Sequence, residues 1–288
     1  MKIKGTGSYV PYTVIKNEAI SHDPDWVFSK LGIRERRQNH FKTTSAMAIK
    51  AAKKAIEDAG IEPNEIGLII CATSTPDKLA PSMACIVQNN IRAWGAAAFD
   101  LNAVCSGFVY ALSVASEMPY ENILVIGADT FSQITDYDDR NSVFFGDGAG
   151  AVIVSGRANY KIYADGIGEM DFQCDRNGTF EMDGKAVFKA GLEYLPIAIN
   201  DVLRDAGLYI TDIDWLLPHQ ASIRMIEQLA DNIGLPFRKV LTNMERYGNT
   251  AAASIAILLD EGEFKTGDKL LLASIGSGWT YGAMIIKW

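Results

Sequence analysis

The chain has 288 residues and a formal net charge of −8, with 48% hydrophobic and 22% charged residues. This balance is typical of one large globular domain or of two fused halves, and its acidity disfavours a nonspecific nucleic-acid binder. No apolar run reaches the roughly 20 residues that a membrane span needs, and the N-terminus has no recognisable signal sequence. We therefore expect a cytoplasmic protein that binds neither nucleic acid nor membrane.

The chain is expected to hold neither a disulfide framework nor a metal. Its four cysteines are scattered through the sequence without a C-x-x-C pair: Cys71, Cys85, Cys105 and Cys174. The cysteines and the three histidines do not follow the spacing of zinc ligands. A reducing compartment is the simplest interpretation.

Short apolar runs alternate with helical patterns along the chain, which predicts an α/β architecture. The expected helices cover residues 46–59 and 106–118, and the expected strands cover residues 66–72, 97–102, 122–127 and 149–155. Gly60 ends the first helix. The second helix is apolar on nearly every side, so it should be buried.

The second half of the sequence repeats the first. Residues 58–60 read Asp-Ala-Gly and recur 147 positions later as residues 205–207. The strand that starts at Ile123 recurs at Leu270 with the same offset, and residues 150–154 resemble residues 282–286. We expect a duplicated fold with halves 1–158 and 159–288, packed as one body. Residues 167–187 have no counterpart and read as an inserted loop region.

Cys105 is the candidate nucleophile, because it lies where a strand gives way to a buried helix. A helix N-terminus is expected to lower the pKa of a thiol and favour the thiolate. A buried structural cysteine is the alternative for this segment alone.

His219 and Asn249 are candidates in the second half. His219 follows the apolar strand 215–218, at the strand end where α/β sheets place functional groups, although a core histidine would also fit. Asn249 precedes an alanine-rich helix, where a turn with an N-cap would also explain it. Cys105 plus the repeat offset falls on Ala252, so the Asn249 segment is the counterpart of the nucleophile turn.

Five segments in this order resemble the β-ketoacyl-acyl carrier protein synthase III family of thiolase-fold condensing enzymes. They are residues 32–36 (GIRER), 103–108 (AVCSGF), 145–151 (FGDGAGA), 218–221 (PHQA) and 248–254 (GNTAAAS). The resemblance runs over almost the whole chain. It implies a thiolase-like five-layered α-β-α-β-α fold built from two similar halves, and a homodimer.

The resemblance also implies a reaction in two steps. Cys105 takes an acyl group from acyl-CoA or acyl-carrier protein, and a malonyl thioester then loses CO2 and attacks the acyl-enzyme. Neutral His219 and the amide of Asn249 would stabilise the charge on the malonyl thioester oxygen. The backbone amides of Cys105 and Ser277 would form the oxyanion hole. Coenzyme A enters as a substrate thioester, and no tightly bound cofactor is implied.

The same matching implies binding residues for substrate and carrier protein. Those for the CoA thioester and the tunnel mouth are Trp26, Lys30, Arg140, Gly184, Ser222 and Arg224. The walls of the acyl pocket are Ala80, Phe131, Phe145 and Ile275. A basic patch for the acidic acyl carrier protein would consist of Lys30, Arg34, Arg36, Arg37, Arg224, Arg238 and Lys239.

The sequence departs from the family at several of these positions. Lys30 stands where an Arg is frequent, and Ser222 stands where an Asn is frequent. Ala80 replaces a Phe that reaches the pocket from the dimer partner, and Ile275 replaces a Phe near the malonyl group. The inserted region is also shorter than usual. Ala80 is expected to widen the acyl pocket if no other side chain fills the space.

Three alternatives remain beside the condensing reaction. One is an acyltransferase of the same fold that passes the acyl group to an oxygen or nitrogen nucleophile without decarboxylation. A catalytically silent partner subunit is the second, and the intact Cys105, His219 and Asn249 argue against it. A papain-like hydrolase is the third, and the duplicated α/β pattern argues against it.

Overall fold

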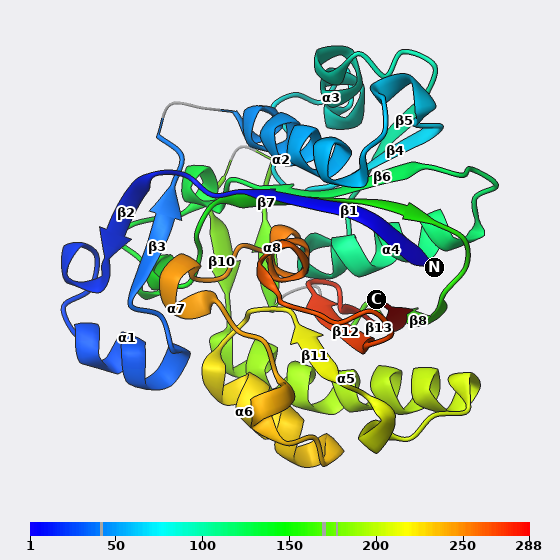
Figure 1. The fold of residues 1–288 in the computed structure, drawn as a ribbon. Helices are drawn as coiled ribbons and strands as arrows, with labels where there is room; N and C mark the ends of the chain where they lie inside the picture. The colour runs from blue at the N-terminus through cyan, green and yellow to red at the C-terminus, as the bar shows by residue number, and fades with distance from the viewer. Residues whose placement is uncertain (41–42, 169–170, 177) are drawn as a thin grey trace.

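The computed structural model describes residues 1–40, 43–168, 171–176 and 178–288, and it shows two sheets with helices between and outside them (Figure 1). The first sheet has the strand order β1-β7-β6-β4-β5 and the second the order β11-β12-β13-β8. Two short hairpins, β2-β3 and β9-β10, complete the sheets of the described residues.

The strands of the first sheet come from the first half of the chain. They are β1 (Lys2–Tyr9), β4 (Leu68–Ala72), β5 (Ala97–Leu101), β6 (Ile123–Asp129) and β7 (Gly148–Ser155). The strands of the second sheet are β8 (Asn159–Ala164), β11 (Trp215–Pro218), β12 (Lys269–Gly276) and β13 (Thr280–Lys287). The proposed boundary at 158/159 therefore falls between the last strand of one sheet and the first strand of the other.

Most of the helices form the remaining layers. They are α1 (Pro24–Leu31), α2 (Thr44–Ala59), α3 (Met83–Ile91), α4 (Gly107–Glu117), α5 (Gly184–Ala206), α6 (Ile223–Ile233), α7 (Met244–Tyr247) and α8 (Ala253–Glu261). The hairpin strands are β2 (Thr13–Lys16), β3 (Glu35–Gln38), β9 (Phe172–Cys174) and β10 (Phe180–Met182). Among the described residues, no helix combines the length and the apolar character that crossing a bilayer requires.

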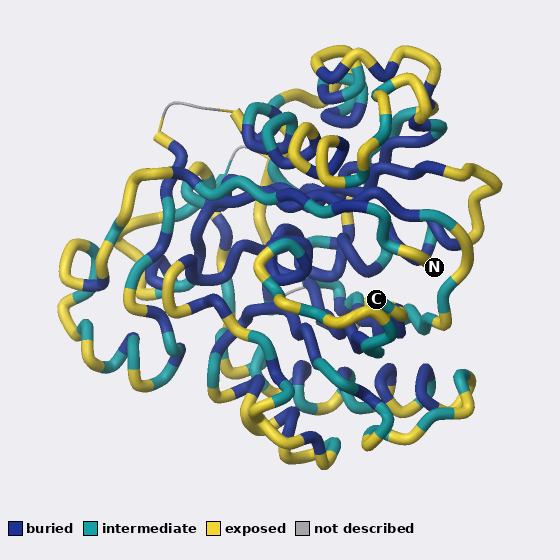
Figure 2. Tube along the Cα trace, viewed as in Figure 1, coloured by how far each residue is buried: buried dark blue, intermediate teal, exposed yellow. Residues whose placement is uncertain are grey.

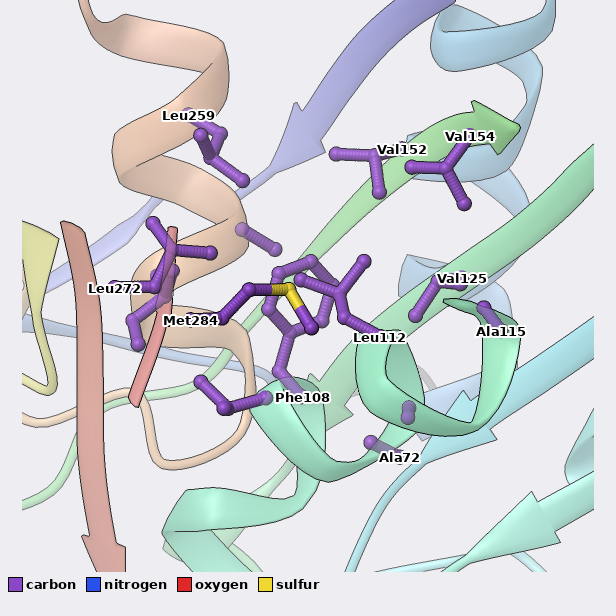
Figure 3. Packing of buried hydrophobic residues seen from close by; sticks show 14 of the residues in the cluster. Ala72, Phe108, Leu112, Ala115, Val125, Val152, Val154, Leu259, Leu272 and Met284 are labelled. Atoms are coloured by element: carbon purple, nitrogen blue, oxygen red, sulfur yellow. The ribbon is translucent and has the colours of Figure 1, made fainter. Parts of the chain in front are cut away.

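Three apolar clusters explain the layers. One joins α2 and α3 to the outer face of the first sheet, and another joins α5 and α6 to the outer face of the second. The third lies between the sheets and surrounds α4 and α8 with side chains from both, among them Phe108 and Met284 (Figure 3). Figure 2 shows this central part buried and the outer helices exposed on their far sides. The five-layered α-β-α-β-α fold is confirmed.

The repeat predicted from the sequence is visible in the topology. Helices α2 and α5 both precede a parallel strand, β4 and β11, and both end in a glycine with left-handed backbone, Gly60 and Gly207. Strands β4 and β6 pair in parallel, as β11 and β12 do. The first sheet adds the parallel edge strand β5, whereas the second shows at that place an isolated bridge between Leu216 and Val240.

Candidate active site

Cys105 lies in a single helical turn, Val104–Ser106, between β5 and α4. The backbone of Val104 is left-handed, with φ of 48°, and its amide donates to Oδ1 of Asn102 at 3.1 Å. Gly276, at the end of β12, lies against this turn: a Cβ there would be 3.0 Å from the Cys105 amide nitrogen. The turn therefore holds the Cys105 side chain at the junction of the halves, where it is 8% exposed.

The thiol of Cys105 does not have the low pKa that the sequence predicted. Burial raises the pKa of this thiol well above its ordinary value, and the charge of Asp129 acts in the same direction. The Cys105 amide acts in the opposite direction but is outweighed. The prediction from the helix N-terminus was wrong because it left out how completely the two halves enclose the sulfur.

Asn249 is fixed by its backbone on one side and by its own side chain on the other. Its amide donates to the carbonyl of Phe144 at 2.9 Å, and its carbonyl accepts from the amide of Gly146 at 3.0 Å. Its Oδ1 accepts from the amide of Ala251 at 2.8 Å. Because the oxygen is engaged in this turn, the Nδ2 group is the part of the carboxamide that can donate to a substrate oxygen.

The turns at Cys105 and Asn249 have the same construction. Asn102 and Asn249 lie 147 positions apart, and each accepts from the amide two residues further on. Those residues, Val104 and Ala251, have φ of 48° and 47°. The internal repeat therefore places Ala252 where the first half carries Cys105. In the second half, the functional group is the asparagine of the turn.

His219 follows β11 and is buried, with 5% of its surface exposed. Its amide donates to the carbonyl of Ala273 at 2.8 Å, and its Nδ1 lies 3.0 Å from Oγ of Ser254. Burial lowers the pKa of His219 to about 3, so the imidazole is neutral at physiological pH. The neutral form predicted from the sequence agrees with this pKa. A hydroxyl can donate or accept here, and when Oγ of Ser254 donates to Nδ1 the ring carries its proton on Nε2 and can donate there.

Residues 249–254 have contacts near each of the three predicted side chains. This segment carries Asn249, its Ser254 contacts His219, and its Ala251 belongs to the same apolar cluster as Cys105. A Cβ on Gly107, two residues after Cys105, would lie 3.8 Å from the Cβ of Ala252. The start of α8 therefore packs beside the start of α4, so groups from both halves meet at one place.

A cavity of about 950 Å³ borders this region. Its walls include all six residues predicted to bind the CoA thioester: Trp26, Lys30, Arg140, Gly184, Ser222 and Arg224. Arg140 faces Trp26, with its Cζ 5.7 Å from the ring centroid. Asn249 also lines the cavity, whereas Cys105 and His219 do not. Phe144 and Met182 line it and also pack against the cluster around Cys105.

Four phenylalanine rings surround Cys105, and we call them the phenylalanine cluster: Phe131, Phe145, Phe172 and Phe180. Phe131 stacks on Phe145 with centroids 4.3 Å apart, and Phe172 stacks on Phe180 with centroids 5.7 Å apart. Phe172 and Phe180 come from the hairpin β9-β10, inside the inserted region. Neither residue was predicted from the sequence, although two phenylalanines in a polar, glycine-containing insert were a usable signal.

Two residues predicted to form walls of the acyl pocket, Ile275 and Ala80, lie outside the cluster around Cys105. Ile275 is buried among residues between β12 and the helices α5 and α6, because alternate residues of a strand face opposite sides and Gly276 takes the side of Cys105. Ala80 is exposed and lies outside the phenylalanine cluster of its own chain. Ser277 follows Gly276 directly, and its hydroxyl donates to the carbonyl of Phe172 at 2.5 Å.

The predicted basic patch is wrong at Arg36. This side chain is fully buried, and its guanidinium donates to the backbone carbonyls of Ile15 and Val143. Arg37 pairs with Glu35 at 3.0 Å, and the ammonium of Lys239 donates to a backbone carbonyl at 2.6 Å. Lys30 and Arg224, in contrast, line the cavity.

Comparison with known proteins agrees with the sequence motifs. Residues 99–175 match the model of 3-oxoacyl-[acyl-carrier-protein] synthase III, and residues 203–288 match the model of its C-terminal part. The chain is 42% identical to the beta-ketoacyl-[acyl-carrier-protein] synthase III of Clostridium acetobutylicum, over 100% of this chain and 98% of the relative.

Solved structures show the same likeness. The crystal structure of 3-oxoacyl-[acyl-carrier-protein] synthase III from Aquifex aeolicus VF5 is 39% identical, with a TM-score of 0.95 over 100% of this chain and 99% of that one. The priming beta-ketosynthase from the R1128 polyketide biosynthetic pathway is 31% identical, with a TM-score of 0.93 over 99% and 95% of the two chains.

Proposed function

The chain belongs to the 3-oxoacyl-[acyl-carrier-protein] synthase III family, and we propose that Cys105, His219 and Asn249 carry out its two half-reactions. The enzyme transfers an acyl group to a thiol and condenses it with a malonyl thioester. Transfer to an oxygen or nitrogen nucleophile is not favoured, because the relatives are named beta-ketoacyl-[acyl-carrier-protein] synthase III. One observation supports the proposal most: the cavity lined by the predicted CoA residues is also lined by Asn249, and its Phe144 and Met182 pack against the cluster around Cys105.

In the first half-reaction, the sulfur of Cys105 attacks the carbonyl of the acyl-CoA thioester. The S–C bond to the enzyme forms as the bond to the CoA sulfur breaks, and the thiol proton leaves with the CoA thiol. The amides of Cys105 and Ser277 hold the tetrahedral oxyanion between them. The raised pKa of the thiol means that attack requires loss of this proton inside the closed site.

In the second half-reaction, the bond between the malonyl carboxylate and its α-carbon breaks and CO2 leaves. The electron pair remains as an enolate whose oxygen accepts from Nε2–H of His219 and Nδ2–H of Asn249. The α-carbon then attacks the acyl carbonyl, and the sulfur of Cys105 leaves as the thiolate. Neutral donors suit this step, because they stabilise the enolate without transferring a proton to it.

The starter group that we propose is a short acyl chain. The phenylalanine cluster packs ring against ring around Cys105, which leaves little length for an acyl tail. Ala80 lies on the surface of its own chain, so it would border the pocket only across a dimer interface. The homodimer is therefore part of the proposal, and the edge strand β5 with the exposed Trp94 supports it.

We propose that both substrates are delivered through the same cavity. Acyl-CoA enters past Trp26 and Arg140, while acyl carrier protein docks near Lys30 and Arg224 at the same cavity. Coenzyme A serves as a substrate thioester, no resident cofactor is needed by these steps, and the enzyme works in the cytoplasm.

The test is acylation of the intact protein, read by mass spectrometry. Wild-type protein incubated with acetyl-CoA should gain one acetyl group, and Cys105→Ala should gain none. Cys85→Ala is the matched control and should label like the wild type. Later addition of malonyl-acyl carrier protein should remove the label and yield a β-ketoacyl product. Label retained by Cys105→Ala would refute the assignment of the nucleophile.

A further inference from the structure

A buried carboxylate joins the two halves beside the site, and the half-reactions above do not use it. Asp129 ends β6 and has no exposed surface. Its Oδ1 accepts from the amide of Ser74 at 2.8 Å and from the hydroxyls of Thr73 and Thr75 at 3.2 and 3.0 Å. Its Oδ2 accepts from the amide of Ala252 at 3.1 Å. The first oxygen thus holds its own half, and the second oxygen reaches the other half.

The bond to Ala252 fixes the turn that carries Asn249. The amide of Ala251 donates to Asn249 itself, and the next amide donates to Asp129. Gly127, also in β6, lets the turn approach closely, since a Cβ there would lie 2.2 Å from the carbonyl oxygen of Ala252. The orientation of the Asn249 carboxamide therefore depends on how the turn is held against β6.

A carboxylate suits this position better than an amide. Each oxygen of Asp129 receives a backbone N–H, from Ser74 on one side and from Ala252 on the other. An asparagine has one acceptor oxygen, so its NH2 group would face one of these donors. The pKa of Asp129 is raised to about 6 by burial, against the opposing effect of these hydrogen bonds, so the carboxylate is charged at neutral pH.

The internal repeat has a glycine in the second half at the position that corresponds to Asp129. The position 147 residues after Asp129 is Gly276, which lies against the amides of Cys105 and Ser106. A strand end without a side chain leaves room beside the Cys105 amide. At the end of β6, in contrast, the carboxylate of Asp129 accepts a hydrogen bond from the equivalent amide, that of Ala252. The Cys105 amide is therefore available to a substrate oxygen, whereas the Ala252 amide is already hydrogen-bonded to Asp129.

We propose that Asp129 is a positioning residue, which holds the Asn249 turn in the geometry required for condensation. This inference rests on the proposed function. It assigns the positioning role of Asp129 to the second half-reaction. Its charge also affects the nucleophile, because it acts together with burial to raise the pKa of the Cys105 thiol.

The experiment separates the half-reactions in the full-length Asp129→Asn variant. Acetyl-CoA is added first, the acetyl-enzyme is quantified by mass spectrometry, and its decay is followed after addition of malonyl-acyl carrier protein. We expect an acetyl-enzyme yield like that of the wild type and a condensation rate lower by roughly 10- to 100-fold, since a small displacement of a reacting group has this effect. The pH profile of Cys105 alkylation by iodoacetamide should move to lower pH, because a negative charge near the thiol is removed.

Asp100→Asn is the matched control. Both carboxylate oxygens of Asp100 also accept backbone amides at a helix start, those of Met83 and Ala84, but on the outer helix α3. This variant should keep the wild-type ratio of condensation to acylation and the wild-type alkylation profile.

Equal loss of both half-reactions in Asp129→Asn, or an unchanged alkylation profile, would overturn the proposal and leave Asp129 a structural residue. If that variant does not fold, the wild type is used: its condensation rate on preformed acetyl-enzyme should fall below about pH 6, the value at which Asp129 protonates. A flat profile there would equally overturn the proposal. Failure of the wild type to condense at all would refute the proposed function instead.

Discussion

The Nδ1 atom of His219 lies 3.0 Å from the Oγ atom of Ser254, so a residue of the α8 helix is placed to hydrogen-bond the imidazole. Both groups are buried, with 5% and 1% of their surfaces exposed. A hydroxyl that donates to Nδ1 keeps the proton on Nε2, which is the form that can donate to an enolate oxygen.

Removing this hydroxyl should therefore weaken condensation. Ser254→Ala is expected to lower the condensation rate by about three- to tenfold, the value of one ordinary hydrogen bond, with normal acylation of Cys105. The measurement is decay of preformed acetyl-enzyme on addition of malonyl-acyl carrier protein. Ser113→Ala removes another buried serine hydroxyl, which bonds to a backbone carbonyl within α4, and should condense normally. A Ser254→Ala variant with full condensation activity would show that the tautomer is set elsewhere.

Two substitutions at Asn249 should distinguish its turn from its donor group. Asn249→Asp keeps an oxygen that accepts from Ala251 but replaces the Nδ2 donor, whereas Asn249→Ala removes both. We expect both variants to form acetyl-enzyme and both to lose condensation by about 100-fold or more, as for loss of one oxyanion donor. Single-turnover assays would measure both steps. If Asn249→Asp condensed normally, the role of Asn249 would lie in the turn alone.

Opening the phenylalanine cluster should change the range of starter groups. Phe180→Ala removes a ring that packs edge-to-face on Phe145 at 4.9 Å, beside Cys105. We expect this variant to be acylated by longer acyl-CoA thioesters than the wild type, measured by intact mass spectrometry across a chain-length series. Phe264→Ala, which removes a ring packed against Trp288, is the control and should keep the wild-type range. An unchanged range in Phe180→Ala would mean that this ring does not limit the pocket.

Burial of His219 should make the protein sensitive to acid. Its pKa in the folded protein is about 3, below the ordinary 6.5, so the unfolded chain binds more protons between these values. The free energy of unfolding contributed by this group is therefore complete above about pH 6.5 and decreases as the pH falls toward 3. Wild type should lose more stability than His219→Gln between about pH 7.5 and about pH 5, measured by denaturant unfolding. Equal losses would contradict a neutral, buried imidazole.

Much of the fold could be predicted because the helices and strands of the repeat follow from short-range sequence patterns. The strand predicted for residues 149–155 is observed as Gly148–Ser155, and the helix predicted for 46–59 is observed as Thr44–Ala59. Their apolar periodicity depends on neighbours within a few residues, so the sequence carries it directly. Expectations that fell on Phe41, Lys42, Glu169, Met170 and Asn177 lie outside the described residues.

The predictions that were wrong or missing concern properties that depend on contacts between distant segments. The pKa of Cys105 was expected to be low from its helix, yet the opposing half buries the sulfur and Asp129 adds a negative charge. Arg36 was expected in a basic patch for acyl carrier protein, yet the glycines 146 and 248 pack against its Cβ inside the protein. Phe172 and Phe180 reach the site only because a hairpin folds back over it.

Val104 and Ala251 both adopt a backbone conformation that side chains with a Cβ rarely occupy, and Val is branched at that carbon. Such residues typically sacrifice about 1–3 kcal/mol of stability each. The molecule therefore keeps conformational strain at both of its matching turns, held in place by the surrounding packing. A glycine at either position would relax that strain but would also make the turn beside the reactive group less rigid. A more stable variant of this enzyme therefore need not be a faster one.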